Sequence, residues 1–221
     1  MASRQAANAS ARAGPFHVRL MKQEDVSAVS AIHSRQFPHS RSTSLGGPFV
    51  RKMYRWFLFN QPELSLVAEQ DGRPIGFVIG ALGTHEIKII LSTLPQIFLG
   101  FMLRPWIILR ASTFREGGSY FKALARMLLF PRPDPPDTPA PVQGGIDSIA
   151  VDRPAQGRGI GRALVGAFEK AARTQGARLL GLTVTMDNLA AQHTYEVCGW
   201  EVRSRNPDLN SILYVKELKD H

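Results

Sequence analysis

The feature that most constrains the fold of this chain is a short apolar strand that runs through a glycine-rich turn directly into a helix, residues 147–165 (DSIAVDRPAQGRGIGRALV). Glycines at alternate positions leave no side chains between the backbone N–H groups and an approaching ligand. The N-terminus of the following helix presents unpaired N–H groups and a partial positive charge at the same place. The segment therefore predicts a phosphate-binding cradle.

The spacing of these glycines excludes two common nucleotide-binding motifs. A Walker loop needs G-x-x-x-x-G-K-[ST], but the glycine five residues after Gly161 is followed by alanine. The dinucleotide fingerprint G-x-G-x-x-G would need glycine at position 162 or 164, where Arg162 and Leu164 stand. What remains is the pattern Q-x-x-G-x-G, which begins at Gln156 after a strand that ends Ile-Ala-Val.

Two further segments complete the pattern. Residues 64–80 predict two strands around an Asp-Gly turn, the strongest hairpin signal in the chain. Residues 187–201 (DNLAAQHTYEVCGWE) contain N-x-x-A-x-x-x-Y-x-x-x-G-[FW]. Together with the glycine turn, these segments resemble the GNAT superfamily of N-acetyltransferases, whose acetyl-CoA signature is [RQ]-x-x-G-x-[GA]. The resemblance covers 64–80 and 144–202, is compatible with 16–60, and does not extend to 84–141.

The order of the expected elements indicates the α/β class, with a parallel strand pair around the glycine turn. The resemblance implies the GNAT (acyl-CoA N-acyltransferase) fold, a mixed central sheet flanked by helices, here with an inserted helical segment. Residues 1–14 are expected to be a disordered tail and 15–221 a single domain. Strands are expected at 16–20, 64–70, 75–80, 147–151, 177–184, from 199 and at 211–218, and helices at 23–35, 49–60, 162–174 and 188–197.

Residues 84–141 form the predicted insertion, two apolar helical stretches followed by a proline-rich linker at 131–141. Lysine, arginine and prolines interrupt the apolar residues, so no stretch of 18–20 is left and a membrane span is not expected. Three interpretations stay open: a helical pair that packs on the sheet or on a second subunit of a homodimer, a lid over the acceptor site, or a peripheral membrane contact.

The net charge and the cysteine content limit the class of ligand and the cellular compartment that can be expected. The net charge of +9 favours a ligand with several phosphates, such as CoA, whereas no dense basic run with interleaved aromatic residues supports nucleic-acid binding. One cysteine excludes an internal disulfide framework and is typical of a reducing, cytoplasmic compartment. Without H-E-x-x-H or a Cys/His cluster, no metal site is expected.

The resemblance implies how acetyl-CoA is held. The backbone N–H groups of the turn, with Arg162, would take the pyrophosphate. The backbone of Ile149 and Val151 would pair with the pantetheine arm, with the Val151 N–H directed at the thioester oxygen. Asn188 reaches the pantetheine in many family members, although helix capping explains this residue equally well. The implied cofactor-binding residues are Ile149, Val151, Gln156, Gly157, Arg158, Gly159, Ile160, Gly161, Arg162 and Asn188.

Two residues are candidates for catalysis. Tyr195 is the expected general acid, because a phenol of pKa ~10 can protonate a thiolate whose acid has pKa ~8.5. One usual position of the family's glutamate base falls on Gly145, which cannot act, and Asp147 two residues later would share its sheet face. Glu69 on the hairpin is a weaker candidate. His193 is expected at the surface, facing away from Tyr195, because the two are two residues apart on one helix.

These observations lead to a functional hypothesis. The chain is expected to be an enzyme that moves an acetyl group from acetyl-CoA to a primary amine by direct attack, because no placed nucleophile is visible. The acceptor is open, with an amino sugar or another small amine among the candidates. A longer-chain acyltransferase that uses the apolar insertion, or a non-catalytic CoA-binding regulatory module, are the alternatives.

Overall fold

The computed structural model describes residues 14–83 and 143–219. At its centre is a seven-stranded sheet in the order β1-β2-β3-β4-β5-β7-β6. All neighbouring strands run antiparallel except β4 and β5, which are parallel, so the predicted mixed sheet is confirmed. The predicted insertion lies outside the described residues. The strands are β1 His17–Leu20, β2 Ser65–Gln70, β3 Arg73–Leu82, β4 Gly144–Val151, β5 Leu179–Thr185, β6 Glu201–Asn206 and β7 Ser211–Glu217.

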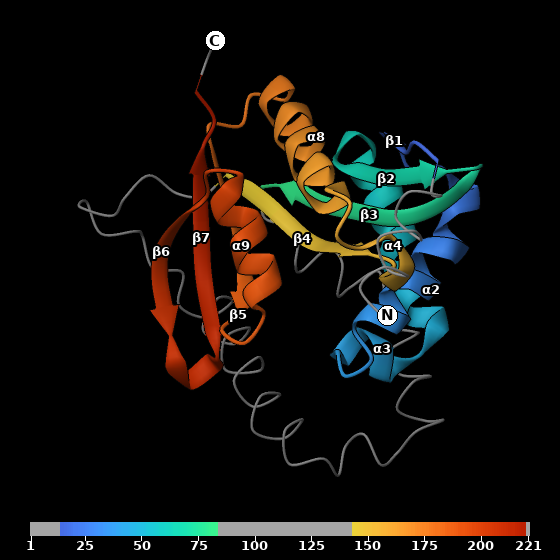
Figure 1. Ribbon diagram of the computed structural model, residues 1–221, viewed down its shortest axis with the longest axis horizontal. Helices are drawn as coiled ribbons and strands as arrows, with labels where there is room; N and C mark the ends of the chain where they lie inside the picture. Colours follow the sequence, from blue (N-terminus) through green and yellow to red (C-terminus); the bar gives the residue numbers. More distant parts are fainter. Residues whose placement is uncertain (1–13, 84–142, 220–221) are drawn as a thin grey trace, which may run out of the picture.

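Helices cover both faces of the sheet (Figure 1). On one face, α8 and α9 bury an apolar cluster against β2, β4, β5 and β7. On the other face, α2 and α4 bury a second cluster against β2, β3 and β4. The helices are α2 Val26–Gln36, α3 Arg41–Leu45, α4 Gly47–Asn60, α8 Ile160–Thr174 and α9 Leu189–Val197, with short 3-10 turns at Gln23–Asp25, Pro62–Leu64, Arg153–Ala155 and Pro207–Leu209.

The helices differ from the prediction near two turns. Helix α3 was not among the expected helices; Ser40 accepts a hydrogen bond from the Thr43 N–H (3.2 Å) and so caps it. Helix α8 begins at Ile160 rather than Arg162, because Gly159 adopts a left-handed conformation (φ 79°) and serves as its N-cap. The glycine turn therefore leads into the helix two residues earlier than expected.

Strands β4 and β5 form a fork. They pair only at Gly144 with Leu180 and Gly145 with Gly181, whereas β4 pairs with β3 along its whole length. Glycine is required where the strands meet, because a Cβ at Gly145 would lie 1.6 Å from the Gly181 carbonyl oxygen. Beyond this point the two strands separate, and no strand within residues 14–83 or 143–219 lies beside this edge of β4.

A β-bulge lies on β4 just after the fork. Ile146 pairs with Gly80 and Ser148 with Ile79, so Asp147 is the extra residue of the bulge. The bulge interrupts the alternation of side chains, and Ser148, whose hydroxyl lies 3.5 Å from Tyr54 Oη, lies on the face covered by α2 and α4. Because the extra residue breaks the period of two, the common face of Asp147 and Gly145 stays a prediction.

Candidate functional site

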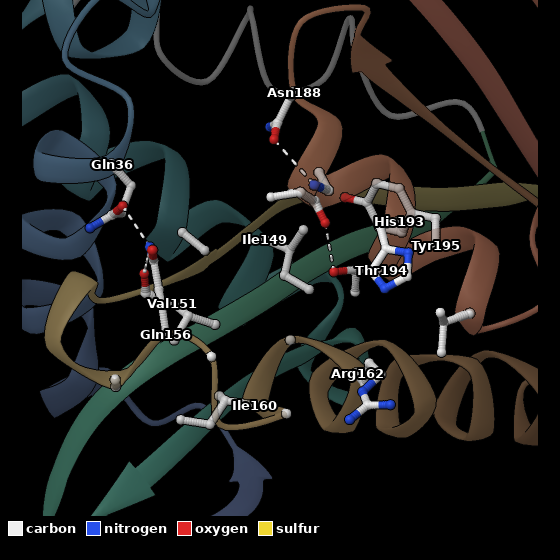
Figure 2. Close-up of a pocket in the computed structure, with 18 of the residues that line it drawn as sticks. Gln36, Ile149, Val151, Gln156, Ile160, Arg162, Asn188, His193, Thr194 and Tyr195 are labelled. Carbon is white, nitrogen blue, oxygen red and sulfur yellow. Dashed lines mark hydrogen bonds between the residues drawn. The ribbon is translucent and has the colours of Figure 1, made fainter. Parts of the chain in front are cut away.

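The fork opens into a cavity of about 690 Å³ (Figure 2). One wall is β4 from Ile149 to Val151, and the floor is the glycine turn with the first turn of α8. Helix α9 forms the opposite wall, and Gln36 with Phe37 at the end of α2 close a further side. Ile149 and Val151 contact the apolar cluster beneath α8, whereas Ala150 contacts the cluster beneath α2. The cavity therefore reaches both faces of the sheet through the gap between β4 and β5.

The turn has the geometry of an anion cradle. Gly157 (φ 77°) and Gly159 (φ 79°) have left-handed backbones that glycine adopts without strain. The first hydrogen bond of α8 runs from the Ala163 N–H to the Gly159 carbonyl (3.0 Å), so the N–H groups of the first turn have no partner within the helix. A Cβ at Gly157 would meet no atom within 4 Å. These residues fit a phosphate group at the helix N-terminus.

Two polar side chains of the turn stabilise the turn itself. The Gln156 amide donates to the Val151 carbonyl (2.9 Å) and to Gln36 Oε1 (3.2 Å), which holds the turn against β4 and α2. The Arg158 guanidinium donates to Gln70 Oε1 and to the Gly14 carbonyl, both at 2.9 Å, and does not line the cavity. The Arg158 side chain is therefore not directed at the cavity, and its backbone is the part of the residue that can contact a ligand there.

The open edge of β4 supplies backbone hydrogen-bonding groups to the cavity. The Asp152 N–H donates to the Ile75 carbonyl just before β3 Gly76 (2.8 Å). Because successive N–H groups of a strand point to opposite sides, those of Val151 and Ile149 face the side from which β5 has separated. Both residues line the cavity. An extended ligand can therefore pair with β4 where a strand would otherwise lie.

Helix α9 places Asn188 and Tyr195 on the wall opposite β4. Asn188 caps the helix through its Oδ1, which accepts the Ala191 N–H (3.2 Å), so the capping role is confirmed. Tyr195 is 6% exposed, with its ring packed against Trp200 and Tyr214. Burial raises the pKa of Tyr195 to about 12, so the phenol is a neutral hydrogen-bond donor at every physiological pH.

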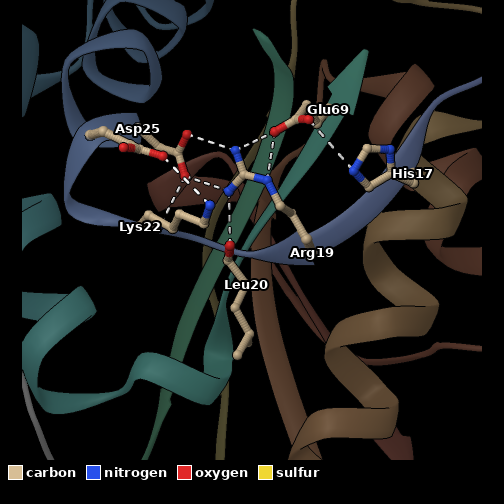
Figure 3. A network of polar contacts seen from close by, with 7 residues as sticks. His17, Arg19, Leu20, Lys22, Asp25 and Glu69 are labelled. Carbon is tan, nitrogen blue, oxygen red and sulfur yellow. Dashed lines mark hydrogen bonds and ion pairs between the residues drawn. The ribbon is translucent and has the colours of Figure 1, made fainter. Parts of the chain in front are cut away.

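The structure separates the carboxylate candidates from the cavity. Asp147 is exposed in the bulge and is not among the lining residues. Glu69 on β2 is not among the lining residues either; it accepts a hydrogen bond from Arg19 (2.6 Å) and pairs with His17 (Figure 3). Arg19 also holds Asp25 at 2.6 Å, and this network joins β1 and β2 to the start of α2. Glu69 is therefore a structural residue.

A buried polar chain lies on the face of β4 that α2 and α4 cover. The Ser148 hydroxyl is 3.5 Å from Tyr54 Oη, which lies 2.7 Å from His33 Nδ1, and His33 Nε2 lies 2.9 Å from Ser42 Oγ. Burial lowers the pKa of His33 to about 4, so its imidazole is neutral at physiological pH. The chain fixes the end of α2, including Phe37, whose ring packs on His33.

Several lining residues were missed by the sequence analysis, and His193 is the polar residue among them on the exposed side of α9. His193 is exposed, as expected, but it lines the same cavity as Tyr195. The cavity extends around α9 toward α8, so residues two apart reach it from different sides of the helix. The sequence does contain a sign of this: four residues at helical spacing share one face of α9, the face beside α8. They are Ala190, His193, Thr194 and Val197.

Other features of the described ranges can be stated briefly. Within residues 14–83 and 143–219, no group of three or more His, Cys, Asp or Glu side chains could hold a metal ion. None of the helices in these ranges combines the length and apolar character needed to cross a bilayer.

Comparisons with known proteins agree with this geometry. The family model described as "Acetyltransferase (GNAT) family" matches residues 26–200. No curated protein sequence matches the chain. Because the matched residues include the fork, the glycine turn and α9, they contain the complete cavity wall from β4 onward.

Solved structures share the fold at low sequence identity. SsHAT has a TM-score of 0.60 and 19% identity, over 94% of this chain and 100% of its own. The yncA protein of Salmonella typhimurium, solved with its cofactor acetyl-CoA, has a TM-score of 0.59 and 14% identity, over 94% of this chain and 96% of its own. The NatC complex bound to Gag peptide and CoA has a TM-score of 0.58 and 14% identity, over 93% of this chain and 100% of its own. The chain, an acyl-transferring enzyme with a mixed sheet forked between β4 and β5, belongs to the GNAT family of acetyltransferases.

Proposed function

We propose that this enzyme transfers the acetyl group of acetyl-CoA to a primary amine by direct attack of the amine on the thioester. The observation that carries the proposal is the fork between β4 and β5, which opens onto an anion cradle on one side and Tyr195 on the other. An amino sugar or another small amine is the proposed acceptor. We place the reaction in the cytoplasm, since a single cysteine suits a reducing compartment.

The donor is held by backbone groups. The N–H groups of the first turn of α8 bind the pyrophosphate, and the open edge of β4 at Ile149 and Val151 pairs with the amides of the pantetheine arm. The Val151 N–H then donates to the thioester oxygen, where negative charge develops as the amine attacks. Because these donors belong to a strand and a helix, they are rigid before the ligand arrives, which lowers the reorganisation needed during the reaction.

Two protons must move during the transfer. The attacking ammonium first loses one proton, the neutral amine forms the carbon–nitrogen bond, and the carbon–sulfur bond breaks as the nitrogen loses its second proton. One of these two protons goes to the base, and the other reaches the departing thiolate through solvent while the Tyr195 hydroxyl on α9 donates a hydrogen bond to the sulfur. Asp147 is the proposed base. It acts through water, because its exposed carboxylate lies in the bulge on β4 and does not line the cavity. An Asp147→Asn variant with an unchanged pH profile for turnover would remove Asp147 from this role.

The test measures thiol release from acetyl-CoA across a panel of amines: nucleotide-linked amino sugars, polyamines, amino acids and peptides. Peptides are included because the NatC complex was solved with a Gag peptide and CoA. Calorimetry with CoA is run in parallel. Turnover with one class of amine supports the proposal and identifies the acceptor. CoA binding without turnover of acetyl-, butyryl- or octanoyl-CoA favours the regulatory module, and a preference for the longer donors favours the longer-chain transferase. Failure to bind CoA contradicts the proposal.

A further inference from the structure

The cavity continues past the cradle into a groove between α8 and α9. Arg162 on the first turn of α8 and His193 on α9 both line this extension, and Figure 2 shows them on the side of the cradle where α9 faces α8. The two helices touch beside them, because a Cβ at Gly161 would lie 3.7 Å from Thr194 Cγ2. Arg162 follows Gly161 in the chain, and His193 precedes Thr194. The two basic side chains therefore flank the same contact between α8 and α9.

The ionisable side chains that line the groove are basic. Among the described residues that line the cavity, Arg162 and His193 are the basic ones, and none is an aspartate or glutamate. Neither side chain forms a hydrogen bond or ion pair with another residue of the described ranges. Arg158, by contrast, is committed to Gln70 and Gly14. The groove therefore presents two uncommitted cationic or N–H donor groups without an internal counter-charge.

The cradle itself accounts for one phosphate cluster only. Its unpaired N–H groups belong to a single helix turn, which suits a pyrophosphate. CoA carries a further phosphate on the 3′ oxygen of its ribose, beyond the pyrophosphate. A second anion needs its own donors, and the basic groove begins where the cradle ends.

We propose that the groove between α8 and α9 binds the 3′-phosphate of the donor, and that His193 makes the enzyme prefer CoA over 3′-dephospho-CoA. This inference rests on the proposed function, in which acetyl-CoA is the donor. The imidazole donates an N–H to the phosphate in either protonation state and adds charge when protonated. Thr194 keeps the helices at contact distance, since its hydroxyl donates to the Ala190 carbonyl (2.9 Å) and its methyl group faces Gly161.

The test is a set of calorimetric titrations with CoA and with 3′-dephospho-CoA at about 0.15 M salt, where long-range charge effects are screened. The variants are His193→Gln, which removes the imidazole but keeps a polar N–H donor, and His193→Lys, which supplies a cation. The matched controls are His39→Gln and Arg55→Gln, since both residues are exposed and neither lines the cavity. The intact full-length chain is used throughout.

The expected result is a change in ligand preference. His193→Gln weakens CoA binding about three- to tenfold, the size of a partly exposed charge-assisted hydrogen bond, and leaves 3′-dephospho-CoA within twofold. His193→Lys keeps the preference for CoA, and both controls retain it. Equal affinity of the wild-type enzyme for the two ligands, or an unchanged preference in His193→Gln, would overturn the inference while the proposed function stands. Failure of the wild-type enzyme to bind either ligand would instead overturn the proposed function.

Discussion

Replacing Tyr195 by phenylalanine removes one hydroxyl from the cavity wall and should slow acetyl transfer without weakening CoA binding. The ring stays 6% exposed against Trp200 and Tyr214, so its apolar packing is preserved. The pantetheine and pyrophosphate contacts come from the backbone of β4 and α8, which the substitution does not touch. The loss is therefore expected in kcat, with the CoA dissociation constant unchanged.

The magnitude follows from the pKa of the phenol. Burial raises the pKa of Tyr195 to about 12, and complete proton transfer to a thiolate whose acid has pKa about 8.5 is unfavourable by about 5 kcal/mol. Tyr195 therefore stabilises the departing thiolate mainly as a hydrogen-bond donor. A hydrogen bond to a charged group contributes about 1.5–3 kcal/mol, which corresponds to a kcat about 10- to 150-fold lower in Tyr195→Phe.

The assay is thiol release with the amine that the panel identifies, measured from pH 7 to 10 alongside CoA calorimetry. Tyr214→Phe is the matched control, because Tyr214 is fully buried, donates its hydroxyl to Glu196 (2.8 Å) and does not line the cavity. The phenol of Tyr195 stays protonated below pH 12, so the ratio of wild-type to variant kcat should be constant over this range. A Tyr195→Phe enzyme within twofold of the control, or a ratio that changes with pH, would refute the reasoning.

Three further predictions test the cradle and its supports. Gly161→Val should weaken CoA binding by more than about tenfold in calorimetry, because the side chain enters the cavity and disrupts at least one charge-assisted hydrogen bond. A Cβ there would lie 3.7 Å from Thr194 Cγ2, an ordinary van der Waals distance, so the variant should still fold, which the midpoint of thermal unfolding checks. Trp200→Phe should lower the free energy of unfolding by about 1–3 kcal/mol in urea titration, because buried Glu169 loses the indole N–H (2.7 Å), while CoA affinity is unaffected. For Asp25, burial would raise the pKa, but hydrogen bonds from Arg19 and a backbone N–H outweigh it and hold the pKa below its usual range. The wild-type protein should therefore lose stability as the pH falls below about 4, and Asp25→Asn, although less stable at neutral pH, should lose less; parallel acid-unfolding curves would contradict this.

The local patterns of the sequence were sufficient for the order of elements and for the cradle. Turn chemistry is encoded over a few residues, so the hairpin around Asp71-Gly72 and the N-cap of Asn188 could be predicted directly. The glycines of the turn could be interpreted in the same way, since a left-handed backbone at positions 157 and 159 calls for glycine whatever the rest of the fold.

The helix ends and the sheet faces were less predictable. Helix α3 depends on a single capping serine within a segment of turn-forming residues, so the pattern of apolar residues carried no sign of it. The bulge at Asp147 adds one residue to β4, and a strand pattern of period 2 cannot show where that addition falls. The face on which the Asp147 side chain lies therefore stays a prediction, as does its role as a base.

What the sequence alone determined is thus the local chemistry: strand, glycine turn and helix, and the residues that line the cradle. Only the tertiary structure decided which distant groups meet there. The fork depends on the contact of Gly145 with Gly181, which joins segments that the sequence separates by a helix. His193 reaches the cavity because α9 packs against α8 at Gly161, and packing between helices depends on side-chain shape across the whole core rather than on spacing within one helix.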